Sequence, residues 1–120
     1  MSLKVLVADD SSTMRKIILR SLQAVGVSNT SEAGDGNEAL IKFQAEPFDL
    51  VMTDWNMPVK TGLELARDIR SLGSQVPVLM ITTEAEKSRV LEAIQAGVTD
   101  YLVKPFTAET LRAKLDKYIV

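Results

Sequence analysis

Apolar runs of strand length alternate with helically spaced apolar positions about five times along this chain. Nearly continuous apolar runs are typical of strands covered on both faces, and here they occupy 3–8, 48–53, 76–81 and 100–103, with a weaker, more polar strand within 27–33. A segment with helical spacing follows each run. Such alternation with short connections predicts an open parallel sheet with right-handed crossovers and helices on both faces, the doubly wound α/β class.

Capping residues mark where four of the five helices begin. The predicted N-caps are Ser11 or Ser12, Asp35 with Glu38, Thr61 with Glu64, and Thr107. Glycines that follow the apolar pattern mark helix ends at Gly26, Gly73 and Gly97. The apolar faces of the third and fourth helices are expected at Leu65, Ala66, Ile69 and Leu72, and at Val90, Leu91, Ala93 and Ile94.

Composition limits the kinds of chemistry that are open to this chain. Its 120 residues, 46% hydrophobic and 25% charged, fit one domain over 1–120. Cys and His are both absent, which excludes thiolate chemistry, imidazole bases and phosphohistidine, so a bound metal must be held by oxygen. A net charge of −2 argues against a nucleic-acid partner. The apolar runs are shorter than the roughly 20 residues that span a bilayer, and no secretion signal opens the chain, so we expect a cytoplasmic protein.

Polar exceptions stand where the predicted strands end. Asp9 and Asp10 follow the first strand, Asp54 the third, Thr82 the fourth and Lys104 the fifth. Taken singly, each is more often a turn former, a helix cap or a solvated lysine than a functional group. Ligands of open α/β sheets bind outside the carboxyl ends of the strands, however, and all five residues fall at that rim. The sequence therefore predicts a shared site.

Three neighbouring aspartates require cations. Two carboxylates about 4 Å apart repel by about 4 kcal/mol at an effective dielectric of about 20. Mg²⁺, with Mn²⁺ as a possible substitute, and the ammonium of Lys104 would supply the opposing charge, with Asp10 and Asp54 suited to the metal. A carboxylate can attack phosphorus when metal and lysine stabilise the transferring group. The pattern predicts a magnesium-dependent phosphoacceptor in which the Thr82 hydroxyl donates to a phosphoryl oxygen.

Four segments carry a resemblance to a known family. The strings VLVADDSSTMRKI, DLVMTDWNMPVKTGLEL, VLMITTEAE and AIQAGVTDYLVKPF resemble the receiver domain of two-component response regulators, most closely its single-domain chemotaxis members. The similarity covers nearly the whole chain. It implies a five-stranded, flavodoxin-like sheet with strand order 2-1-3-4-5, an order that the periodicity alone does not give.

The resemblance also assigns roles at the site. It implies that Asp54 is the phosphoacceptor and that Asp9 and Asp10 are the acidic pair, with Mg²⁺ held by this acidic group and the backbone carbonyl of Asn56. It implies that the protein is a phosphorylation-activated switch and not an enzyme. Its own phosphotransfer and slow autodephosphorylation would be its only reactions.

Other residues match the family's signalling parts. Thr82 matches the switch hydroxyl, Lys104 the phosphate-contacting lysine before a usually cis proline, and Tyr101 the aromatic that turns inward on activation. The fourth helix, fifth strand and fifth helix form the output face in this family. On it the matching residues are Lys87, Val90, Tyr101, Val103, Lys114 and Lys117.

The resemblance implies a histidine kinase, of the chemotaxis type, as phosphoryl donor and a downstream protein target such as the flagellar motor switch. It also implies a monomer that does not insert into membranes. A phosphorelay intermediate is the alternative that the residues leave open. One departure from the family pattern is Lys60-Thr61-Gly62, where Met-Asp-Gly or Met-Asn-Gly is usual, and Lys60 is expected to add a cation near the site.

Two other classes share parts of this pattern. Aspartyl-phosphate phosphatases of the haloacid-dehalogenase type place a second Asp two residues after the nucleophile, but here that residue is Asn56, whose amide cannot shuttle a proton. Flavodoxin-like cofactor binders have a hydroxyl- and glycine-rich phosphate loop, whereas Asp9 and Asp10 would repel a phosphate in the absence of metal. Both are less well matched than a switch.

Overall fold

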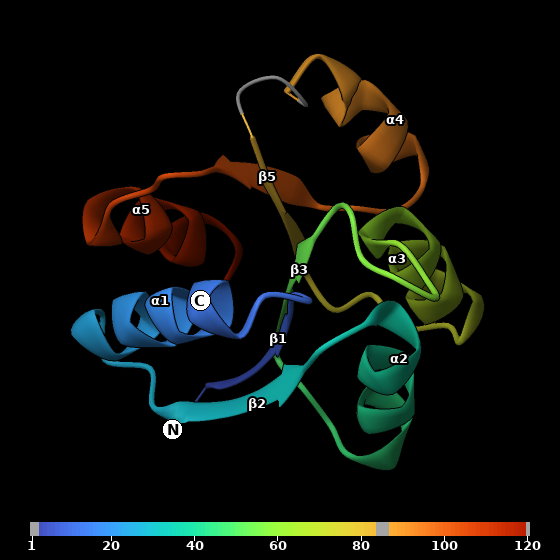
Figure 1. Ribbon diagram of the computed structural model, residues 1–120, viewed down its shortest axis with the longest axis horizontal. Coiled ribbons are helices and arrows are strands. Elements are labelled where there is room, and N and C mark those ends of the chain that lie inside the picture. Colours follow the sequence, from blue (N-terminus) through green and yellow to red (C-terminus); the bar gives the residue numbers. More distant parts are fainter. Residues whose placement is uncertain (1–2, 84–86, 120) are drawn as a thin grey trace.

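The computed structural model describes residues 3–83 and 87–119 and contains a five-stranded parallel sheet (Figure 1). The strand order is β2-β1-β3-β4-β5, which confirms the order implied by the resemblance. The strands are β1 (Lys4–Ala8), β2 (Asn29–Ala33), β3 (Leu50–Asp54), β4 (Val78–Thr82) and β5 (Asp100–Val103). The strand order reverses between β1 and β3, so their carboxyl ends lie beside the crevice where such sheets bind ligands.

Helices cover both faces of the sheet. Figure 1 shows α1 and α5 on one side and α2, α3 and α4 on the other. The helices are α1 (Ser12–Ala24), α2 (Gly36–Ala45), α3 (Gly62–Ser71), α4 (Val90–Gln95), preceded by the 3₁₀ turn η1 (Lys87–Arg89), and α5 (Ala108–Tyr118). No helix among the described residues is both long and apolar enough to cross a membrane.

Alternate strand residues fill two separate hydrophobic cores. Along β1, Val5 and Val7 face the core under α1 and α5, whereas Leu6 and Ala8 face the core under α2, α3 and α4. Every residue of β3 and β4 is buried, as the continuous apolar runs predicted. Burial of both faces fixes the register of these strands, because a shift by one residue would move each side chain into the opposite core.

Four helix starts have the side-chain caps that the sequence predicted. Ser11, Asp35, Thr61 and Thr107 each accept a hydrogen bond from the backbone N–H three residues later. The Asp35 cap differs from a capping box in one respect, because the Glu38 carboxylate accepts from the N–H of Gly34 and not from that of Asp35. The preceding loop is thereby tied to the first turn of α2.

The reciprocal cap of α3 is expected to contribute to stability. Thr61 Oγ1 accepts from the Glu64 N–H at 3.2 Å, and the Glu64 carboxylate accepts from the Thr61 N–H at 3.0 Å. We expect Thr61→Ala to lower the free energy of unfolding by about 1 kcal/mol, because one backbone donor loses its partner. Urea unfolding followed by Trp55 fluorescence measures this loss. Thr61→Ser keeps the hydroxyl and should retain most of the stability; an equal loss in both variants would contradict capping as the cause.

Three side chains that were expected in apolar faces are instead exposed. Leu72 is 49% exposed, Leu91 69% and Ile94 42%, so these predictions were wrong. Leu72 is the C-cap residue of α3, beyond its last full turn. The α4 helix has six residues, and of them only Ala93 is buried, because so short a helix turns little of its surface toward the sheet.

Candidate phosphoacceptor and metal site

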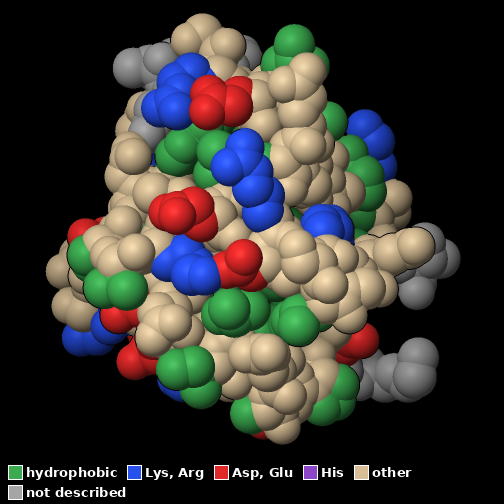
Figure 2. Space-filling model, turned by 90° about the vertical axis from the view of Figure 1, so that its right-hand side faces the viewer, with side chains coloured by type: hydrophobic (Ala, Val, Ile, Leu, Met, Phe, Trp, Pro, Cys, Tyr) green, Lys and Arg blue, Asp and Glu red, His purple; other side chains and the backbone are tan. Residues whose placement is uncertain are grey.

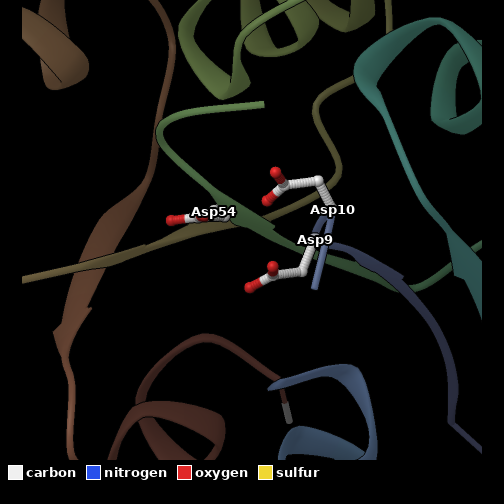
Figure 3. A group of neighbouring side chains, drawn as sticks. All are labelled: Asp9, Asp10 and Asp54. Carbon is white, nitrogen blue, oxygen red and sulfur yellow. The ribbon is translucent and has the colours of Figure 1, made fainter. Parts of the chain in front are cut away.

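The pairing of β1 with β3 brings three aspartates together. Ala8 at the end of β1 lies opposite Thr53, so Asp9 and Asp10 begin the loop beside Asp54, the last residue of β3. Each of the three offers a carboxylate oxygen, and these oxygens lie within 4.8 Å of one another. Figure 3 shows the three side chains extending from the strand ends into a common space. The predicted convergence of the acidic residues is therefore observed.

Asp54 is held from two directions. Its Oδ1 accepts a hydrogen bond from the Trp55 N–H at 2.9 Å and an ion-paired one from Lys104 Nζ at 3.3 Å. Lys104 reaches this position because its own N–H donates to the carbonyl of Thr82, which anchors the residue after β5 to the end of β4. The ammonium thus approaches Asp54 across β4, as the sequence predicted.

The Asp9 carboxylate has the character of a cation ligand. Asp9 is 1% exposed, and its Oδ1 accepts from the Ser11 N–H at 2.9 Å. Its Oδ2 is buried and has no hydrogen-bond partner among the described residues. A buried carboxylate oxygen without a partner is costly, and a cation would satisfy it. The all-oxygen donor set fits a hard divalent ion such as Mg²⁺.

Burial raises the pKa values of both inner carboxyls. For Asp54, burial is the largest cause, the Asp9 charge adds to it, and Lys104 and the Trp55 N–H oppose it. For Asp9, burial again dominates over the Ser11 N–H and the charge of Lys104. One lysine therefore does not offset the cost of burying two neighbouring carboxylates. The arrangement calls for additional positive charge.

A hydrogen-bonded loop after β3 fixes the backbone beside the acidic site. The Gly62 N–H donates to the Trp55 carbonyl at 2.9 Å, which folds residues 55–62 back over the strand end. A Cβ at Gly62 would lie 2.2 Å from the Asp54 carbonyl oxygen, so only glycine fits there. This turn carries Asn56, whose side chain is exposed and whose carbonyl is the ligand that the resemblance implies.

Thr82 and Tyr101 lie on the same face of the sheet. Thr82 is fully buried at the end of β4, and its Oγ1 donates to the Thr83 carbonyl at 3.3 Å. Met80, two residues earlier, is paired with Tyr101 and packs in the same core as its ring. Because side chains two residues apart share a face, Thr82 and Tyr101 point to the α4 side of two adjacent strands.

The predicted output residues are only partly brought together. Tyr101, Val103 and Lys114 line one groove of about 350 Å³ between β5 and α5, and Lys117 lies nearby on α5. Val90, the first residue of α4, is half-buried. The side chain of Lys87 lies outside the described residues.

Lys60, the cation expected near the site, is paired with a residue of α3. Its ammonium forms an ion pair with Asp68. Its backbone packs against α2, where a Cβ on Gly36 would lie 2.2 Å from the Lys60 carbonyl oxygen. On the face formed by α2, α3 and α4, acidic and basic side chains are interspersed and form no large patch of either charge (Figure 2).

The sequence pattern does not single out Arg15, which supports the site from α1. Its Nη1 donates to the Asp9 carbonyl at 2.6 Å and its Nε to Glu32 at 3.0 Å. These bonds fasten the β1–α1 loop to β2. The only signal in the sequence is an arginine one turn into the helix that follows the acidic loop, which is too common to be informative.

Comparison with known proteins identifies the family. A family model described as the response regulator receiver domain matches residues 5–116. The chain belongs to the response regulator receiver domain family. Its function is that of the family, a phosphorylation-activated switch in two-component signalling.

Relatives of this receiver chain are similar over nearly their full length. The chemotaxis protein CheY-3 of Vibrio cholerae is 50% identical over 118 residues, 97% of this chain and 91% of that protein. The chemotaxis protein CheY of Pseudomonas aeruginosa is 48% identical over 96% of this chain and 94% of its own length.

Two solved structures have the same fold as this receiver. Chemotaxis protein CheY4 of Vibrio cholerae has a TM-score of 0.90 at 39% identity, with 99% of this chain and all of that one covered. The receiver domain of a Pseudomonas aeruginosa sensor histidine kinase has a TM-score of 0.88 at 27% identity, covers 99% and 98% of the two chains, and is described with a magnesium ion in its active-site cleft.

Proposed function

We propose that this receiver accepts a phosphoryl group on Asp54 and signals by binding a protein partner, with residues 1–120 acting as one receiver domain. The observation that supports this most directly is the buried Asp54 carboxylate, which is paired with Lys104 and lies within reach of two further carboxylates. A carboxylate held in this way is a nucleophile that still needs a second positive charge before it can approach an anionic phosphoryl group.

In the proposed reaction an oxygen of Asp54 attacks the phosphorus of a phosphohistidine or of an acyl phosphate. Trp55 and Lys104 both donate to Oδ1, so we assign the attack to Oδ2. A bond forms between this oxygen and phosphorus, the bond to the donor's nitrogen or oxygen breaks, and the donor leaves with the electron pair. Lys104 then neutralises one phosphoryl oxygen, and the Thr82 hydroxyl donates to another.

We assign metal binding to Asp9, Asp10, Asp54 and the Asn56 carbonyl. When bound, Mg²⁺, or Mn²⁺ in its place, stabilises the negative charge on the transferring phosphoryl group. The buried, unpartnered Oδ2 of Asp9 and the raised pKa values of Asp9 and Asp54 support a cation at this place. The structurally similar receiver described with magnesium supports the choice of ion.

The aspartyl phosphate is proposed to persist long enough to serve as a signal. Asn56 stands where hydrolases of the competing class carry an acid, and its amide cannot transfer a proton to or from water. Slow autodephosphorylation is therefore the only hydrolysis that we assign to the chain.

Transmission is proposed to run from Thr82 to Tyr101. A phosphoryl group on Asp54 would draw the Thr82 hydroxyl toward it, and the space that this hydroxyl vacates lies on the same face as the Tyr101 ring. The output face would then comprise Val90, Tyr101, Val103, Lys114 and Lys117, with Lys87.

The names of the relatives support a proposal for the partners. Two proteins about half identical to this chain are named as chemotaxis proteins, which supports a chemotaxis-type histidine kinase as donor and a motor-switch protein as target. We place the receiver in the cytoplasm, as a monomer that binds neither nucleic acid nor membrane. A phosphorelay intermediate would use the same site and differ only in its partner.

Acetyl phosphate tests the proposed reaction without a kinase. Incubation with acetyl phosphate and Mg²⁺ should add one phosphoryl group per chain, measured as intact mass. The same incubation with a chelator should give little adduct, because the carboxylate cluster then repels the donor. No adduct with Mg²⁺, or several adducts, would contradict the proposal.

Thr82→Ala should separate phosphorylation from transmission. We expect the rate of adduct formation to stay within about threefold, because Thr82 assists but does not attack, while the response of Tyr101 falls by about half or more. Intact mass measures the first quantity, and the phosphorylation-induced shift of the Tyr101 ring in NMR spectra measures the second. Thr83→Ala is the matched control. An unchanged Tyr101 response in Thr82→Ala would rule out the hydroxyl as the link.

A further inference from the structure

Asp100 gathers three hydrogen bonds at the start of the edge strand β5. Its Oδ2 accepts from the Tyr118 hydroxyl at 2.6 Å and from Lys114 Nζ at 3.0 Å, and its Oδ1 accepts from the Tyr101 N–H at 2.8 Å. The carboxylate is largely buried between β5 and α5, with a side chain 13% exposed. Charge-assisted hydrogen bonds to both oxygens of one carboxylate fix the geometry of the groups that make them.

The same lysine also contacts the ring of Tyr101. Lys114 Nζ lies 5.0 Å from the centroid of that ring, within the range of a cation–π contact. Asp100 pairs with Leu79 and so faces α5, whereas Tyr101 faces the opposite side of the sheet. Lys114 therefore extends around the open edge of β5, with its ammonium held on one side by Asp100 and resting on the Tyr101 ring on the other.

Hydrogen bonding keeps this carboxylate charged. Burial alone would raise the pKa of Asp100, but the bonds from Tyr118, the Tyr101 N–H and Lys114 together lower it. The same Asp100 contact raises the pKa of the Tyr118 hydroxyl, which stays protonated and able to donate. The network is thus complete at neutral pH, with a full negative charge opposite the lysine.

We propose that Asp100 is a positioning residue that holds Lys114 against the Tyr101 ring and so stabilises the ring orientation seen in this structure. The aromatic side chain cannot turn away without losing the ammonium, which Asp100 keeps in place. This restraint opposes the inward movement assigned to Tyr101 under the proposed function and sets how readily the output face switches. The restraint itself concerns the resting protein and does not depend on phosphorylation.

NMR of the unphosphorylated protein tests the restraint. In the protein without substitutions, the ring current of Tyr101 should shift the Lys114 ε-CH₂ protons upfield. Asp100→Ala should abolish this shift and increase the rotamer averaging of Tyr101. Lys114→Gln should give the same Tyr101 averaging, and the double variant should add nothing further if Asp100 acts through Lys114. Tyr118→Phe, which removes one bond but leaves the ion pair, is the matched control and should retain the shift.

A phosphoryl analogue then measures the consequence. Beryllofluoride with Mg²⁺ should bind Asp100→Ala about two- to fivefold more tightly than it binds the protein without substitutions. This is the factor expected for one exposed cation–π contact. An unchanged Lys114 shift in Asp100→Ala overturns the proposal, and so does a changed shift with unchanged beryllofluoride affinity. If no variant binds beryllofluoride, the phosphoacceptor assignment fails, while the NMR comparison still decides whether Asp100 restrains Tyr101.

Discussion

Asp54→Asn should eliminate the phosphoryl adduct that acetyl phosphate and Mg²⁺ produce on this chain. The amide oxygen of Asn is a weak nucleophile and carries no charge for the metal, so both the attacking group and one proposed ligand are lost. We expect the rate of adduct formation to fall by a factor of about 10³ or more, to below detection by intact mass. Burial and the hydrogen bond from the Trp55 N–H should be kept, since the Asn side chain has nearly the same shape.

Asp10→Asn is the matched comparison for this experiment. Asp10 lies in the same carboxylate group but is exposed, and its proposed part is to hold the metal. Its variant should still form an adduct on Asp54, more slowly and with a higher Mg²⁺ requirement. An adduct of equal yield in Asp54→Asn would place the phosphoacceptor elsewhere and remove the basis of the proposed function.

Most of the fold could be predicted because each strand has a short-range signal. The continuous apolar runs that became β3 and β4 are buried on both faces, and Thr61 and Thr107 cap helices where the pattern placed them. The site was predictable for the same reason, because parallel strands end at one rim and its polar residues follow those ends directly. Strand order was different. It depends on which crossovers pack best, and only the resemblance supplied it.

Several side-chain contacts away from the strand ends could not be predicted from the sequence. Lys60 follows the acidic strand end but pairs with Asp68, a choice set by the path of the loop. Asp100 lies 14 and 18 positions from its partners on α5, and no local pattern connects them. Likewise, the exposure of Leu91 follows from the position and short length of α4 and not from helical periodicity.

Without magnesium, the titration of Asp9 and Asp54 should make this protein less stable as the pH rises. Both carboxyls have pKa values raised above the ordinary value of 3.8. Between that value and the raised ones the folded chain binds more protons than the unfolded chain, so the free energy of unfolding decreases as the pH rises through the folded pKa values. Their contribution to the free energy of unfolding is fully present only below pH 3.8, where both carboxyls are protonated. Mg²⁺ should reverse the loss, since it binds the ionised, folded site.

The difference in the free energy of unfolding between the protein without substitutions and Asp54→Asn isolates this effect from that of groups whose pKa is lowered. Asp100, whose pKa is lowered, contributes stability above its unfolded pKa and cancels in the difference. Two carboxylates 4.8 Å apart repel by about 3.5 kcal/mol at an effective dielectric of about 20, and the ion pair with Lys104 offsets part of that. Asp54→Asn should therefore be more stable than the unmodified chain by roughly 1–3 kcal/mol at pH 7 in chelator, with the gap closing toward acid pH and on addition of Mg²⁺. Urea unfolding of both proteins from acid pH to pH 7 measures this difference in stability. A difference that is independent of both pH and Mg²⁺ would show that Lys104 already balances the two charges.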